Sequence, residues 1–162
     1  MRTTMRKATL LALPLLLTAA PALAQSAGGN AGLALAALVA FQSPLVSAHD
    51  KQIMTYMLNG NLNFSYPAGK KIVVKADSIV CRASNVDISS HSCAFTFGAK
   101  KPSITGRAGH ELYATFIQVG IPGDGAAGTI FEALKTLDCT VDPNAVKQRD
   151  GSGADCSFTP GQ

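Results

Sequence analysis

The four cysteines of this chain restrict its fold more than any other feature of the 162-residue sequence. They are Cys81, Cys93, Cys139 and Cys156. An even number of cysteines in an exported chain is typical of a disulfide framework. We predict the local pairing, Cys81–Cys93 and Cys139–Cys156, because each pair encloses a short polar segment of the kind that connects hairpin strands. The sequence has no C-x-x-C spacing, so we interpret the pairs as structural bridges rather than as a zinc or redox site.

The first 24 residues predict export. Three basic residues precede an apolar stretch from Ala8 to about Ala20, and Ala22-Leu23-Ala24 matches a small-x-small cleavage site. We therefore expect a signal peptide over residues 1–24 and one mature domain over residues 25–162, with a flexible N-terminus over residues 25–30. An uncleaved anchor helix is the alternative, but the apolar stretch is shorter than the ~20 residues of a membrane span. The expected location is the periplasm or the external medium.

Cleavage of the signal peptide would also change the charge of the protein. The whole chain has 14 Lys and Arg against 10 Asp and Glu, a net charge of +4. Three of the basic residues and none of the acidic ones lie in residues 1–24, which leaves 11 basic and 10 acidic residues and a net charge of +1. This balance gives no general nucleic-acid footprint, so we expect no nucleic-acid partner.

The hydrophobic pattern predicts an α+β domain. Alternating apolar residues predict strands around Lys71–Ala76, Ser78–Cys81 and Cys93–Phe97. Apolar residues at helical spacing predict one helix over about Arg107–Gln118 and a second over about Ala126–Leu137. The expected fold is a single small exported domain. Its antiparallel sheet, with disulfide-stapled hairpins, would pack against this helical pair.

Two further helical segments are expected near the mature N-terminus. The apolar run Ala31–Phe41 is too short to span a bilayer, and it predicts either a buried helix or an interaction surface. Ser47 is placed to cap a helix over about Ala48–Leu58, with Asp50 three residues later as an acidic capping-box partner.

A short repeat suggests that part of the chain is duplicated. Cys93 to Gly98 and Cys156 to Gly161 both read Cys-small-Phe-Thr-x-Gly, which is consistent with a repeated helix-plus-hairpin unit. The predicted plan of a helix pair followed by a disulfide hairpin is similar to that of exported proteinaceous enzyme inhibitors of the β-lactamase-inhibitor type. This resemblance lies in the plan of the fold and not in a shared motif.

No catalytic constellation stands out. Gly123 to Gly128 matches the G-x-G-x-x-G pattern of dinucleotide sites, but it follows a helical stripe instead of a strand, so a helix–loop corner explains it better. The three histidines, His49, His91 and His110, lack the close spacing of a metal motif. A three-histidine site would need distant segments to converge. We expect no cofactor and no metal, with His110 and Glu111 as the candidates if the protein is an enzyme.

The prediction that remains is an exported, non-enzymatic binding module, for example a protein-binding or inhibitor-like domain. Its working surface would be the polar disulfide loops Arg82–Ser92 and Thr140–Asp155, because rigid hairpins present such loops to partners. The residues expected to contact a partner protein of the envelope or the medium are Lys147, Arg149, Asp150 and His91. Two alternatives stay open: a small exported hydrolase or metal-dependent enzyme, and an envelope-associated structural protein that uses Ala31–Phe41.

Overall fold

The chain forms a seven-stranded antiparallel sheet covered by helices. A computed structural model describes residues 25–84, 87–118, 129–147 and 153–160. The elements are β1 (Gln25–Gly28), α1 (Gly29–Gln42), α2 (Ala48–Leu58), β2 (Ile72–Ala76), β3 (Ser78–Ser84), the 3-10 helix η1 (Ile88–Ser90), β4 (Ser92–Thr96), β5 (Ser103–Thr105), α3 (Gly106–Gln118), β6 (Thr129–Val141), α4 (Pro143–Lys147) and β7 (Ala154–Pro160). The strand order is β1-β7-β6-β3-β4-β5, and β2 also pairs with β6. The predicted α+β fold with two disulfide-stapled hairpins is confirmed.

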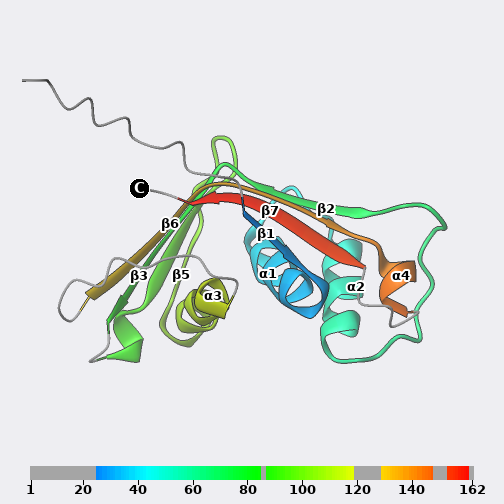
Figure 1. The fold of residues 1–162 in the computed structure, drawn as a ribbon, viewed down its shortest axis with the longest axis horizontal. Coiled ribbons are helices and arrows are strands. Elements are labelled where there is room, and N and C mark those ends of the chain that lie inside the picture. Colours follow the sequence, from blue (N-terminus) through cyan, green and yellow to red (C-terminus); the bar gives the residue numbers. More distant parts are fainter. Residues whose placement is uncertain (1–24, 85–86, 119–128, 148–152, 161–162) are drawn as a thin grey trace, which may run out of the picture.

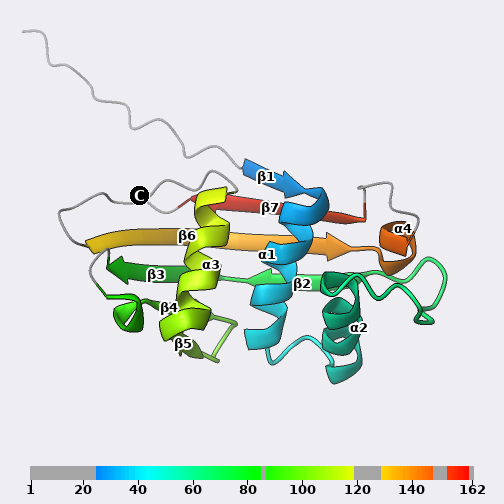
Figure 2. The ribbon, with the colours of Figure 1, turned by 90° about the horizontal axis from the view of Figure 1, so that it is seen from below.

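The helices α1, α2 and α3 lie on one face of the sheet (Figure 1). Successive side chains of a strand point to opposite faces of the sheet, so apolar residues at every second position can cover one face only. The strand β2 shows this pattern. Ile72, Val74 and Ala76 are buried toward the helices, whereas Val73 and Lys75 are exposed on the opposite face. Seen from below, α1 and α3 run side by side across the sheet, and α2 lies beyond α1 (Figure 2). A groove between α1 and α3 is lined by Ala34 and Leu38 of α1 and by Ala114 and Gln118 of α3.

The sheet contains two equivalent βαββ units. The first comprises β1, α1, the strand pair β2 and β3, and β4; the second comprises β5, α3, β6 and β7. The strands β2 and β3 pair with β6 in one continuous register, from Ile72 opposite Val141 to Ser84 opposite Thr129. In the first unit, β2 and β3 together therefore take the place that the single long strand β6 has in the second unit. Each unit adds its first strand to the last strand of the other, because β1 pairs with β7 and β5 pairs with β4.

The disulfides occupy equivalent positions in these units. Cys81 lies opposite Cys93 on β3 and β4, and Cys139 lies opposite Cys156 on β6 and β7. Both predicted bridges are formed, Cys81–Cys93 and Cys139–Cys156. Each bridge lies beneath a helix, since Cys156 Sγ is 3.4 Å from the Gly32 carbonyl of α1 and Cys93 Sγ is 3.7 Å from the Gly109 carbonyl of α3. The structure thus supports the repeated helix-plus-hairpin unit.

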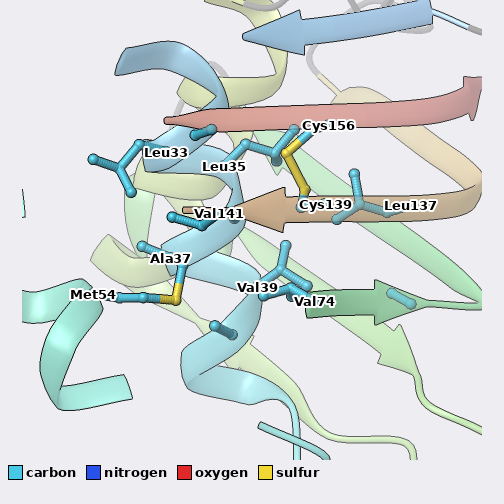
Figure 3. Close-up of a cluster of buried hydrophobic side chains, with 14 of the residues drawn as sticks. Leu33, Leu35, Ala37, Val39, Met54, Val74, Leu137, Cys139, Val141 and Cys156 are labelled. Atoms are coloured by element: carbon cyan, nitrogen blue, oxygen red, sulfur yellow. A yellow bond between two sulfur atoms is a disulfide. The ribbon is translucent and has the colours of Figure 1, made fainter. Parts of the chain in front are cut away.

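The helix α1 is part of the core. Leu35, Ala36, Ala37, Val39 and Ala40 have no exposed surface. In Figure 3, the side chain of Leu35 lies beside the second disulfide and that of Val39 lies beside Val74 of β2. Of the two readings of Ala31–Phe41, the buried helix is therefore the one observed. In the part of the chain that the structure describes, no helix has the length and apolar character needed to cross a membrane.

The helix α2 begins and ends as predicted, over Ala48–Leu58. The Ser47 hydroxyl accepts the Asp50 backbone N–H at 3.1 Å and donates to the Asp50 carboxylate at 2.7 Å. The Ser47 hydroxyl therefore caps the helix as expected, and the Asp50 carboxylate binds the same hydroxyl.

The second predicted helix, over about 126–137, is wrong from residue 129 onward. That segment forms the central strand β6, and residues 126–128 lie outside the described ranges. A register shift, typical of a β-bulge, lies between Leu134 and Thr136 on the β7 side. Leu134 and Leu137, three residues apart, are therefore both buried, which resembles helical spacing. The partner of α3 in the helical layer is α1, not a second C-terminal helix.

The segment 25–30, for which we predict flexibility, has regular secondary structure. Residues 25–28 form the edge strand β1, and residues 29 and 30 begin α1. Pairing with β7 gives this segment backbone hydrogen bonds, and Ala27 is buried opposite Cys156. The strand β1 could not be predicted from the residues around it, because its partner strand lies about 130 residues later in the chain.

Candidate functional site

The predicted binding loop Thr140–Asp155 is folded at its base. Asp142 caps the short helix α4, since its carboxylate accepts the backbone N–H groups of Asn144 and Ala145 at 3.0 and 3.3 Å. The Asp142 N–H donates to the Gly153 carbonyl at 2.6 Å. Together with the Cys139–Cys156 bridge, these contacts fix the entry and exit of the loop.

Lys147 packs on the body of the protein. Its ammonium donates to the Phe64 carbonyl and lies 4.2 Å from the centroid of the Phe64 ring. This contact joins α4 to the long connection between α2 and β2. Two other predicted binding residues, Arg149 and Asp150, lie outside the described residues. The structure therefore gives Lys147 a packing role and leaves partner contact by this loop as a prediction.

A cavity of about 400 Å³ lies where this loop meets α1 and α2. It is lined by Gly29, Asn30, Leu33, Met57, Gly60, Leu62, Val146, Gly153 and Ala154. These described lining residues are apolar or small except for Asn30, and none carries a charge. The cavity is thus suited to an apolar group. No local pattern in the sequence predicts this cavity, because its walls come from three distant segments.

His91, expected to be exposed in the first disulfide loop, is instead buried with 4% of its surface accessible. The reason is the docking of α3 over the start of β4. The His91 carbonyl accepts the Gly106 N–H at 2.8 Å, and Gly109 packs on the His91 backbone. His91 is therefore not a surface contact residue of a polar loop.

The burial of His91 brings it to His110. The Nδ1 atoms of the two rings are 2.9 Å apart, and the ring centroids are 4.8 Å apart. Tyr113 lies edge-on to the His91 ring at 5.9 Å between centroids. Nearby Asp87 has a lowered pKa, chiefly because its carboxylate accepts the Ser89 hydroxyl and N–H, with a smaller contribution from attraction to His91. Two of the three histidines, which lie far apart in the sequence, therefore converge in the fold.

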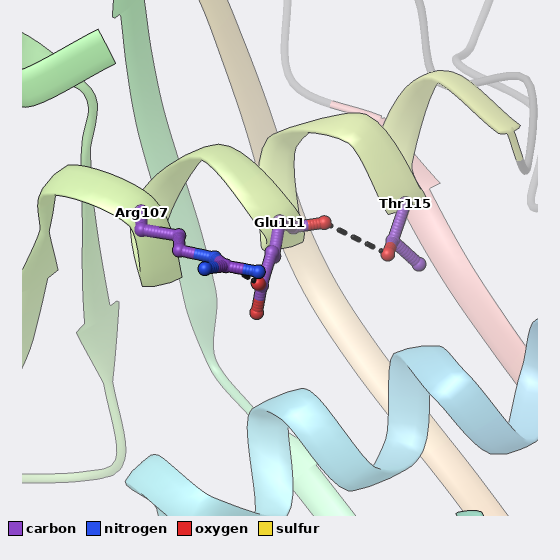
Figure 4. A network of polar contacts seen from close by, with 3 residues as sticks. All are labelled: Arg107, Glu111 and Thr115. Carbon is purple, nitrogen blue, oxygen red and sulfur yellow. Dashed lines mark hydrogen bonds and ion pairs between the residues drawn. The ribbon is translucent and has the colours of Figure 1, made fainter.

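His110 and Glu111 also line the groove between α1 and α3. This groove has a volume of about 360 Å³, with Ala34 and Leu38 of α1 on the other wall. The Glu111 carboxylate accepts the Arg107 guanidinium at 3.1 Å, and its carbonyl accepts the Thr115 hydroxyl at 2.9 Å (Figure 4). His110 and Glu111, the adjacent residues proposed as candidates for an enzyme, both line this groove. Glu111 is exposed and paired, however, and this is the usual state of a surface carboxylate on a helix.

No family model, curated protein or solved structure matches this chain. The similarity of plan to inhibitors of the β-lactamase-inhibitor type rested on a C-terminal helix pair, and the structure replaces the second helix of that pair with β6.

The third histidine, His49, belongs to a separate cluster at the start of α2. Its ring stacks on that of Tyr66 at 6.1 Å between centroids. The Tyr66 hydroxyl donates to the Asp50 carboxylate at 2.9 Å. Among the described residues, no group of three or more His, Cys, Asp or Glu side chains is placed to hold a metal ion. A three-histidine centre is thus not formed in this part of the chain.

We expect Tyr66 to titrate well above an ordinary tyrosine. Burial, the hydrogen bond to Asp50 and the charge of Asp50, in decreasing order of effect, together raise its pKa from 10.0 to about 12. Because the folded-state pKa is the higher one, the stabilisation is complete below pH 10 and is lost as the pH rises through about 12. Absorbance at 295 nm should show a phenol titrating near pH 12, and Tyr66→Phe should remove that step. A titration curve unchanged by Tyr66→Phe would contradict the assignment.

Proposed function

We propose that the protein is an exported, disulfide-stabilised, non-enzymatic binding module that holds an apolar group of its partner in the cavity beside α4. The observation that supports this is the composition of the cavity. Leu33, Met57, Leu62 and Val146 supply most of its side-chain wall, and the volume of about 400 Å³ lies within the range of about 300–1,000 Å³ that is common for ligand sites.

The walls of the cavity are held in place before any partner arrives. The Cys139–Cys156 bridge joins the strands at the base of the loop, and Ala154 is buried between them and α1. Lys147 ties α4 to Phe64, which lies in the connection between α2 and β2. Preorganisation of this kind lowers the entropy that binding must overcome. It favours recognition over a chemical step, since the described lining residues offer no nucleophile, acid or base.

The expected partner is another protein, in the envelope or the medium, that inserts one aromatic or aliphatic side chain. Single buried anchors of this kind carry much of the binding energy of protein interfaces. Export is supported by the two disulfides, which are typical of oxidising compartments. The choice between periplasm and medium remains part of this proposal.

Side-chain analogues test the proposal without a known partner. We expect indole and p-cresol, analogues of the tryptophan and tyrosine side chains, to shift the NMR methyl signals of Leu33 and Met57. Val146→Phe, which places a ring in the cavity, should weaken this binding at least ~10-fold, a change of about 1.4 kcal/mol. The matched control is Val73→Phe on the uncovered face of the sheet, where the side chain is 49% exposed.

The outcome of this titration is decisive in either direction. Binding that is lost in Val146→Phe and kept in Val73→Phe supports an apolar site at the cavity. Binding that survives Val146→Phe, or shifts confined to residues outside the cavity, would show that the cavity is only a packing gap between the loop and the helices.

A further inference from the structure

The edge of β2 that faces away from β6 has no role in the proposed binding function. On one side β2 pairs with β6, from Ile72 opposite Val141 to Ala76 opposite Leu137. On the other side, no strand or loop among the described residues forms a backbone pair with residues 72–76. A strand edge of this kind presents N–H and C=O groups that another chain can pair with. The edge is therefore a place where an extended segment of a partner can bind.

The edge lacks the features that block pairing at other sheet edges. Proteins commonly protect an edge with a very short strand, a proline or a bulge. The edge strand β5 has three residues and directly follows Pro102, and β1 has four residues. The strand β2 has five residues, none of them proline or glycine, and its register with β6 is continuous. Lys75 is the charged residue of β2, and its ammonium pairs with the Asp138 carboxylate of β6 at 2.7 Å, so its charge is balanced within the sheet.

We propose that β2 binds an extended acidic segment of a partner protein as an added strand. Exposed lysines lie at both ends of the edge: Lys70, Lys71, Lys100 and Lys101. The first two directly precede β2. The last two follow the turn after β4, and this turn lies beside the end of β2 because the Asp77 carboxylate accepts the Gly98 N–H at 2.6 Å. Among the described residues none of these four lysines forms an ion pair, so their charge is available to a partner.

The charge at this edge favours an acidic partner over a second copy of the chain. A second copy would add the same lysines on the other side of the pairing, and like charges on neighbouring strands are destabilising. Carboxylates in that place would instead pair with the lysines and would steer the partner toward the edge.

The position of α2 defines the pattern of the bound segment. The helix lies below β2 in Figure 1 and extends past it in Figure 2. Alternate side chains of an added strand would therefore face α2, and the others would lie beside Val73 and Lys75 on the uncovered face. Apolar residues suit the first set and carboxylates suit the second. The expected segment thus alternates apolar and acidic residues over about five positions.

A synthetic peptide tests this inference. The probe is acetyl-Glu-Val-Glu-Val-Glu-Val-Glu-amide, titrated into the purified chain with both disulfides formed. We expect NMR shifts of the backbone amides of residues 72–76, and no binding of the matched peptide that has lysine at each glutamate position. Lys71→Glu with Lys101→Glu should weaken binding at least ~10-fold. The control is Arg82→Glu with Arg107→Glu, which makes the same change in charge at exposed residues outside β2 and should alter the affinity less than ~3-fold because salt screens distant charges.

N-methylated peptides distinguish strand addition from simple charge attraction. In an added strand, the N–H groups of alternate residues point toward β2 and the others point to solvent. Methylation of all valine nitrogens or of all glutamate nitrogens should therefore abolish binding in one case and preserve it in the other. No binding to the unchanged chain, equal effects of the two methylations, equal losses in the two double variants, or shifts confined to residues outside β2 would overturn the inference. None of these results bears on the cavity beside α4, so the proposed function is tested independently.

Discussion

Replacing all four cysteines with alanine is expected to leave the protein unfolded at 37 °C. The bridges link residues 12 and 17 positions apart, and closing loops of these lengths stabilises a fold by about 3 kcal/mol each in the chain-entropy model. Their sum, about 6 kcal/mol, approaches the whole free energy of unfolding of a small domain, which is about 5–15 kcal/mol. Urea denaturation followed by circular dichroism measures the loss.

The two single-bridge variants provide the control. Cys81→Ala with Cys93→Ala, and Cys139→Ala with Cys156→Ala, should each lower the free energy of unfolding by about 3 kcal/mol and stay folded. Similar losses are expected because the bridges occupy equivalent places in the two βαββ units. A quadruple variant that keeps its melting temperature within a few degrees would show that the sheet and helices alone hold the fold.

The features that the sequence predicts correctly are those with local causes. The capped helix α2, the amphipathic helix α3 and the strands β2, β3 and β4 each follow from a pattern within about a dozen residues. The disulfide pairing also follows from local hairpins, since Cys81 faces Cys93 directly across β3 and β4. Where capping residues and periodicity agree, the segment forms as expected.

The features that were missed depend on distant contacts. The strand β6 was predicted as a helix because its bulge near Leu134 gives buried residues three positions apart. Edge strand β1 forms because β7 completes the sheet beside it. The approach of His91 to His110 depends on α3 docking over β4, which no spacing in the sequence reveals. The cavity beside α4 likewise needs three segments to meet.

A second repeat in the sequence marks the two βαββ units. The segments Gly29-Asn30-Ala31-Gly32 and Gly106-Arg107-Ala108-Gly109 share the pattern Gly-x-Ala-Gly. In both, the first glycine joins a strand to a helix with a positive φ, 60° at Gly29 and 64° at Gly106. A side chain would strain this conformation. The second glycine of each pattern lies over a disulfide, so this repeat identifies the two equivalent units more clearly than the repeat after Cys93 and Cys156.

The second glycine of each pattern allows the helix to pack closely on the sheet, because a side chain there would meet strand backbone. Gly→Ala inside an exposed helix usually stabilises it by about 1 kcal/mol. At Gly32 we expect the opposite, a loss of about 3 kcal/mol in the free energy of unfolding, because overpacking against rigid backbone exceeds the gain in helix propensity. A Cβ at this position would lie 2.5 Å from the Ala27 carbonyl oxygen and 3.3 Å from that of Ala154. Both atoms belong to paired strands that cannot move apart without breaking β1 from β7.

Gly109→Ala is the matched comparison in the second unit. Its Cβ would meet the His91 carbonyl oxygen at 3.1 Å and Ser92 Cα at 3.3 Å, which a shift of a few tenths of an ångström relieves. We therefore expect a loss of about 1 kcal/mol or less, part of it offset by helix propensity. Urea denaturation of both variants measures the difference. Equal losses at Gly32 and Gly109 would mean that the two helices dock with equal tolerance. A gain at Gly32 would mean that α1 moves away from β1 at little cost, and that the edge strand contributes little to stability.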